Sequence, residues 1–161
     1  MYEEVNNLVK NFDITKTEKY YKGKYKYNDF YEPFKLEEIE KFEKDNNIVF
    51  PEEMRKYITE ISQSMYKNHL GVRDIPLHEK CIEFMPEIKS LDDNFDENFK
   101  IINKIKVYEI RQLGCGFSDN IVLEGEFAGT IWENTLASSG NIELKAKTFY
   151  NYILDFNEMK Q

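Results

Sequence analysis

The sequence has few of the residues and patterns that mark several protein classes. It holds two cysteines, Cys81 and Cys115, in 161 residues, and they stand in no metal-binding spacing. A reduced compartment is the simplest interpretation, so we expect a cytoplasmic protein. No run of about 18 apolar residues occurs, which excludes a membrane-spanning helix. The N-terminus has no basic segment leading into an apolar core, so we expect no secretory signal.

Histidine and catalytic motifs are equally scarce. His69 and His78 are too far apart for the i, i+4 spacing with which one helix chelates zinc, so we expect ordinary loop or surface histidines. The seven glycines form no phosphate-binding loop, and Ser118 lacks a glycine that a G-x-S-x-G elbow requires. The sequence therefore predicts no metal, no cofactor and no catalytic residue.

Basic charge is in deficit. The chain has 22 Lys and Arg against 30 Asp and Glu, a net charge of -8 at pH 7. Such acidity disfavours nucleic acids and anionic membranes, and it favours a basic partner. Lysines alternate with aromatic residues between Tyr20 and Phe34, a pattern that can form a stacking platform for single strands. We favour an arm whose tyrosines pack on the body while its lysines stay in water.

Aromatic and aliphatic residues are plentiful, with 12 Phe and 11 Tyr, and the length suits one folded domain. Helical spacing of apolar residues predicts four helices. They cover 5–12, Leu36 to Asn46, a segment from Pro51 to Met65, and a closing helix that begins with Thr148 as its N-cap. In the second helix we expect Leu36, Ile39 and Phe42 to point inward and Glu43 to face water.

The strand signals are concentrated after residue 106. Predicted strands cover 107–113, 121–124, 127–133 and 141–145, with a tight turn at 114–116 and a two-residue turn at Gly125-Glu126. Residues 66–80 suggest a loop with a short strand around Ile75, and 81–106 suggest no clear element. Structural roles are expected for Gly114, Cys115, Gly116, Gly125, Gly129 and Trp132, the last in the core. The fold class is α+β, a single domain with a mostly antiparallel central sheet packed by N-terminal helices and a C-terminal helix.

Three segments in this order resemble the SUKH superfamily, in the branch of fungal cell-wall-synthesis regulators and bacterial immunity proteins. They are LEEIEKFEKDNNIVFPEEMRKYI at 36–58, LGCGFSDNIVLEGEFAGTIW at 113–132, and the closing helix TFYNYI at 148–153. The resemblance implies a SUKH-like domain over 34–161, preceded by a helix and the aromatic arm at 1–33. It also implies a protein that is not an enzyme but binds and neutralises a cognate toxin domain, often a nuclease.

Acidic clusters suggest how such a partner would be recognised, because carboxylates can mimic phosphate charge and steer a basic protein. The predicted partner-binding residues are Asp92, Asp93, Asp96, Glu97, Glu124, Glu126 and Glu133. Two alternatives stay open. One is a regulatory interaction module of the same fold without a toxin. The other is a small hydrolase that uses paired carboxylates or Cys115 between its two glycines, although a small residue packed at a strand end explains Cys115 more simply.

Overall fold

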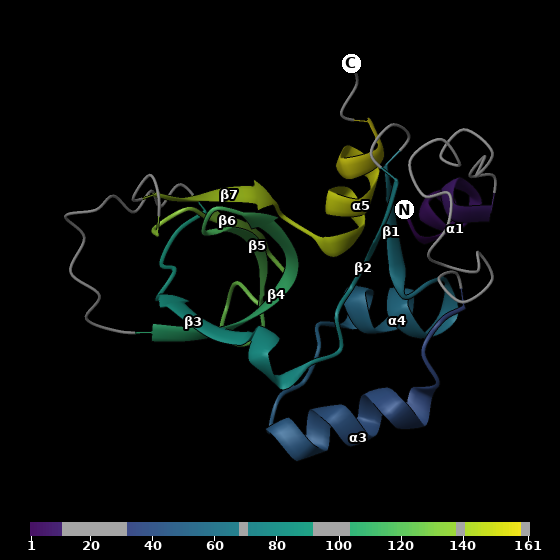
Figure 1. Ribbon diagram of the computed structural model, residues 1–161, viewed down its shortest axis with the longest axis horizontal. Coiled ribbons are helices and arrows are strands. Elements are labelled where there is room, and N and C mark those ends of the chain that lie inside the picture. The colour runs from purple at the N-terminus through teal and green to yellow at the C-terminus, as the bar shows by residue number, and fades with distance from the viewer. Residues whose placement is uncertain (11–31, 68–70, 92–103, 138–140, 159–161) are drawn as a thin grey trace.

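The computed structural model describes residues 1–10, 32–67, 71–91, 104–137 and 141–158 (Figure 1). Its elements, in chain order, are α1 (Tyr2–Lys10), α3 (Leu36–Asn46), α4 (Glu52–Glu60), β1 (Ser64–Lys67), β2 (Gly71–Asp74), the 3-10 helix η3 (Glu79–Cys81), β3 (Ile82–Pro86), β4 (Lys104–Gly114), β5 (Phe117–Val122), β6 (Ile131–Asn134), β7 (Ile142–Ala146) and α5 (Phe149–Glu158). The predicted α+β class is confirmed. The segment 66–80, where a loop with a short strand around Ile75 was expected, contains the end of β1 and all of β2. The segment 81–106, where no clear element was expected, contains β3 and the start of β4.

The strands form two antiparallel sheets. One is a five-stranded meander in the order β3-β4-β5-β6-β7, and the other is the β1-β2 hairpin. In Figure 1 the larger sheet curls strongly, and the helices lie on one side of it with α5 between β7 and β1. A register shift between Glu109 and Arg111 marks a bulge in the long strand β4, and a bulge increases local twist and bending.

Both faces of the curled sheet are apolar, and each has its own core. Along β4, Tyr108 and Ile110 pack into the larger core with residues of all four helices, whereas Ile105 and Val107 pack into a smaller core inside the curl. This alternation follows from the two-residue period of a strand. Trp132 of β6 is fully buried in the smaller core, which confirms its predicted place.

The turn predictions are half right. The tight turn between β4 and β5 is confirmed, and Cys115 and Gly116 at its centre have φ of 54° and 80°. Positive φ at both central residues is the feature of a type I′ turn. Cys115 is exposed, so its expected packing at a strand end is wrong. The two-residue turn at Gly125-Glu126 is also wrong, because β5 ends at Val122, β6 begins at Ile131, and a loop at 123–130 joins them.

Helix α3 has the predicted bounds but not the predicted faces. Leu36, expected inside, is 48% exposed, whereas Glu43, expected in water, is 8% exposed. Leu36 opens the helix one turn before the buried Ile39, so it lies beyond the edge of the core. Glu43 Oε1 accepts a hydrogen bond of 2.7 Å from the backbone N–H of Phe50, and this bond satisfies a buried donor in the segment that leads into α4.

Candidate protein-binding surface

The seven predicted partner-binding residues fall into three groups. Asp92, Asp93, Asp96 and Glu97 lie outside the described residues. Glu124 and Glu126 are exposed in the loop between β5 and β6, and Glu133 is half-buried within β6. Glu124 and Glu126 therefore share one exposed loop, whereas Glu133 lies in a strand outside it.

The loop at 123–130 lies along the segment that joins α3 to α4. Lys106 connects the two, because its backbone N–H donates to Glu124 Oε1 (2.9 Å) and its Nζ donates to the carbonyl of Asn47 (3.2 Å). Further along the loop, a Cβ placed on Gly129 would lie 3.6 Å from Pro51 Cβ, which is ordinary van der Waals contact. Two segments far apart in sequence thus form one continuous surface.

We call four residues of this surface the acidic rim: Val49, Glu52, Glu124 and Glu126. Val49 is 68% exposed in the α3–α4 segment, and Glu52 is exposed in the first turn of α4. The rim thus comprises three exposed carboxylates and one exposed apolar side chain. Sequence analysis identified the two loop glutamates but missed Val49 and Glu52, because only the contact of loop and segment unites them.

A hollow of about 240 Å³ lies beside the rim, lined by Pro51, Glu52, Glu53, Ala128, Gly129, Lys147, Thr148 and Phe149. Its charges are balanced within the protein. Glu53 Oε2 accepts a 3.0 Å hydrogen bond from the backbone N–H of Tyr150, in the first turn of α5, where the helix dipole favours an anion. Lys147 adds a positive charge. This hollow therefore joins α4 to α5, and Glu53 is already engaged in that junction.

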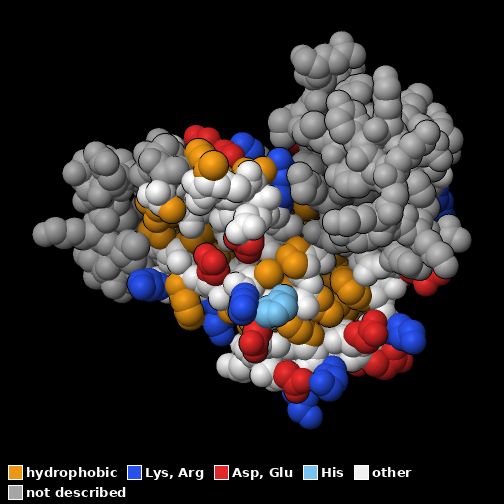
Figure 2. Space-filling model, in the orientation of Figure 1, with side chains coloured by type: hydrophobic (Ala, Val, Ile, Leu, Met, Phe, Trp, Pro, Cys, Tyr) orange, Lys and Arg blue, Asp and Glu red, His pale blue; other side chains and the backbone are white. Residues whose placement is uncertain are grey.

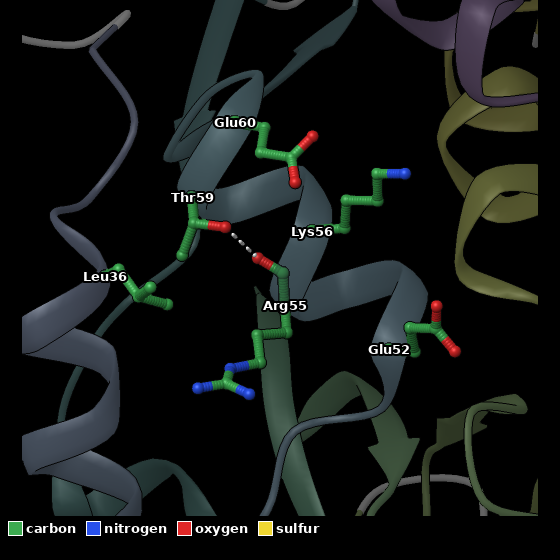
Figure 3. A pocket seen from close by; sticks show the side chains of 6 residues that line it. All are labelled: Leu36, Glu52, Arg55, Lys56, Thr59 and Glu60. Carbon is green, nitrogen blue, oxygen red and sulfur yellow. Dashed lines mark hydrogen bonds between the residues drawn. The ribbon is translucent and has the colours of Figure 1, made fainter.

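The outer face of α4 borders a second, shallower hollow of about 320 Å³ (Figure 3). Arg55 is directed to the side of Leu36 and Lys56 to the opposite side of the helix. Arg55 contacts two carboxylates of α3, since its NH2 is 3.3 Å from Glu40 and its Nε is 3.5 Å from Glu43.

Helix α1 contacts the other side of α4 through Tyr2. Lys56 Nζ lies 4.3 Å from the ring centroid of Tyr2, whose hydroxyl donates to Glu60 Oε2 (2.8 Å). Glu52 lines both hollows and is the lining carboxylate for which the described residues show no hydrogen bond or ion pair. On the face shown in Figure 2, acidic and basic side chains are intermixed around apolar ones.

Glu133 belongs to a different arrangement, a row of charged residues across the sheet. Its Oε2 lies 2.7 Å from Lys145 Nζ of β7, and it stands opposite Asp119 of β5 in the strand register. Asp119 is fully buried, and its Oδ2 accepts hydrogen bonds from Tyr152 Oη (2.7 Å) and Arg111 NH1 (3.2 Å). Burial raises the pKa of Asp119 and outweighs the lowering by Tyr152 and Arg111.

Sequence analysis missed Asp119 although a signal was present. The residue stands two positions before Ile121 in a strand, on the same face as that buried residue. A carboxylate on the apolar side of a strand needs compensating partners. Those partners come from β4 and α5, which the local pattern does not reveal.

Other candidate residues have structural explanations. His78 is exposed, and its Nδ1 accepts from the backbone N–H of Lys80 at the start of η3. Tyr108 Oη donates to the carbonyl of Pro76 (2.6 Å) and accepts from His78 N–H (3.0 Å), and burial raises the pKa of this phenol. Burial likewise raises the pKa of the Cys81 thiol. His69 lies outside the described residues.

In the part of the chain that the structure describes, no three His, Cys, Asp or Glu side chains are grouped as a metal site would require. None of the described helices has the length and apolar character needed to cross a membrane. The resemblance to the SUKH superfamily stays a prediction from sequence. Comparisons with protein-family models, with curated proteins and with solved structures found no match.

Proposed function

We propose that this chain is an immunity-type protein that binds and neutralises a basic toxin domain, and that the acidic rim is its contact surface. The observation that carries the proposal is the rim itself, in which exposed Val49 is accompanied by Glu52, Glu124 and Glu126. Complementary charge accelerates association and selects the partner, and a desolvated apolar contact slows dissociation. The net charge of -8 also favours association with a basic partner.

The rim is partly preorganised for binding. The hydrogen bond from Lys106 N–H orients the Glu124 carboxylate, and the loop rests on Pro51. Less side-chain freedom is therefore lost when a basic partner arrives. Because the rim carboxylates are exposed, salt should weaken binding mainly through the association rate, with a Debye length of about 8 Å at physiological ionic strength.

Co-expression with the toxic domain encoded beside this gene tests the function. We expect restored growth and co-purification of the two chains. Protection without a stable complex, or equal protection against an unrelated toxin, would contradict specific neutralisation by binding. A regulatory interaction module would instead give neither rescue nor a complex with that domain.

Charge reversal in the double variant Glu52→Lys, Glu126→Lys tests the rim. We expect the association rate with the toxin domain to fall at least about tenfold at low salt, because two steering charges change sign. Surface plasmon resonance at several salt concentrations measures this rate.

The matched control is Glu3→Lys, Glu4→Lys, which makes the same change in net charge in the exposed first turn of α1. We expect it to slow association much less. Equal slowing by the two double variants would show that net charge, and not the rim, steers the partner. Circular dichroism confirms that both variants are folded.

A further inference from the structure

Asp119 is a buried acid whose two oxygens have different surroundings. Its side chain is fully buried, Oδ2 has two donors, and Oδ1 is buried without a hydrogen-bond partner among the described residues. An ionised carboxylate whose second oxygen is buried and has no protein donor is costly. A neutral carboxyl keeps Oδ2 as an acceptor and removes the buried charge.

The charged and titratable groups around Asp119 come from four elements. Arg111 of β4 is 3.2 Å away, Tyr152 of α5 is 2.7 Å away, Glu133 of β6 stands opposite in register, and Lys145 of β7 pairs with Glu133. The hydrogen bond from Tyr152 and the charges of Arg111 and Lys145 favour the anion, whereas Glu133 opposes it. Burial is the largest influence on the Asp119 pKa, and it raises that pKa.

Helix α5 connects this acid to the rest of the molecule. Two positions before Tyr152, Tyr150 donates its backbone N–H to Glu53 of α4 and has an edge contact with Tyr2 of α1, with ring centroids 6.1 Å apart. Phe149 has an edge contact with Tyr57 at 5.4 Å. Because α5 lies between β7 and β1 (Figure 1), opening at Tyr152 would loosen the junction between the large sheet and the helices.

We propose that Asp119 is a proton-linked latch, whose neutral carboxyl holds α5 on the sheet and whose ionisation favours opening of α5. When α5 opens, water reaches Asp119 and its pKa returns toward the ordinary value of 3.8. The pKa of Asp119 is higher in the closed state than in the open state, so protonation of Asp119 stabilises the closed state. The closed state is therefore favoured most at low pH, and this advantage is lost as pH rises through the raised pKa.

Amide hydrogen exchange of α5 tests the latch between about pH 4 and about pH 8, a range that starts near the ordinary Asp pKa. After correction for intrinsic exchange, we expect protection of the α5 amides to fall severalfold as pH rises. Protection should fall by up to tenfold per pH unit over the range in which Asp119 is protonated in the closed state and ionised in the open state. In Asp119→Asn, which keeps the shape and stays neutral, the corrected protection should not change with pH.

The matched control is Asp155→Asn, which removes an exposed acid on the same helix and should retain the wild-type pH dependence. A carboxyl-carbon NMR titration of the wild-type protein gives a second measurement that needs no variant, and we expect the Asp119 signal to titrate above the ordinary value of 3.8. An Asp119 signal that is ionised throughout this range would overturn the latch. So would an Asp119→Asn variant with the pH dependence of the wild type.

Discussion

At the scale of single residues, burial of carboxylates is the main departure from the simple rule that charges face water. Glu43 and Asp119 are both buried, and each accepts a hydrogen bond from another element or segment, Glu43 from Phe50 and Asp119 from Tyr152. Glu43 acts as a brace, because its acceptor satisfies Phe50 N–H where the chain turns from α3 into α4. Such a bond matters chiefly because its loss leaves a buried donor unpaired.

Glu43→Ala tests this brace. We expect the free energy of unfolding to fall by about 2–3 kcal/mol, since a buried backbone donor loses a charged acceptor. Glu40→Ala removes only the exposed contact to Arg55 and should cost less than about 1 kcal/mol. Urea titrations of both variants give the comparison. Equal losses would mean that Glu43 contributes no more than a surface ion pair.

At the scale of elements, the β4–β5 turn shows why glycine positions are not equivalent. Gly114 and Gly116 both have positive φ, of 86° and 80°. A Cβ on Gly114 would meet nothing within 4 Å, whereas a Cβ on Gly116 would lie 2.7 Å from Ala137 Cβ. The first position therefore needs glycine only for its backbone, and the second needs it for space as well.

Because of this difference, alanine substitution at the two glycines should lower the free energy of unfolding by different amounts. Gly114→Ala should lower the free energy of unfolding by about 1 kcal/mol, the strain of a left-handed alanine. Gly116→Ala should lower it by about 2–3 kcal/mol, because the turn or the segment at Ala137 must also move. Thermal melts of the two variants show which substitution destabilises the protein more. Gly114→Ala as the more damaging change would contradict the account of the turn.

At the scale of the whole molecule, two cores lie on opposite faces of one curled sheet. Val5 of α1 is fully buried in the larger core, and Trp132 is fully buried in the smaller one. Strand β4 supplies residues to both cores, so neither core forms completely without the other. We therefore expect one cooperative unfolding transition.

Val5→Asp tests this coupling with the single tryptophan as reporter. We expect a loss of about 3 kcal/mol or more from a buried unpaired charge. The denaturation midpoint should shift equally by Trp132 fluorescence and by far-UV circular dichroism. The control Val49→Asp places the same charge at a 68% exposed position and should shift stability by less than about 0.5 kcal/mol. A fluorescence midpoint that stays in place would show that the two cores unfold independently.

The sequence by itself determined the α+β class, the bounds of α3 to the residue, the N-cap at Thr148, the tight turn at 114–116 and the burial of Trp132. These features depend on local periodicity, on glycine backbone freedom and on the solvation of large apolar side chains. Two of the expected site residues, Glu124 and Glu126, also lie on the surface that the fold builds.

Only the tertiary structure decided the rest. It buried Glu43 and Asp119, exposed Leu36, and brought the 47–51 segment against the 123–130 loop, which allows the acidic rim to include residues from both sides. The β1–β2 hairpin and β3 lacked a clear local pattern and gain their stability from pairing and packing. The physical reason is the same in each case. The partners that make these arrangements favourable are distant in sequence and become neighbours only through strand register and helix packing.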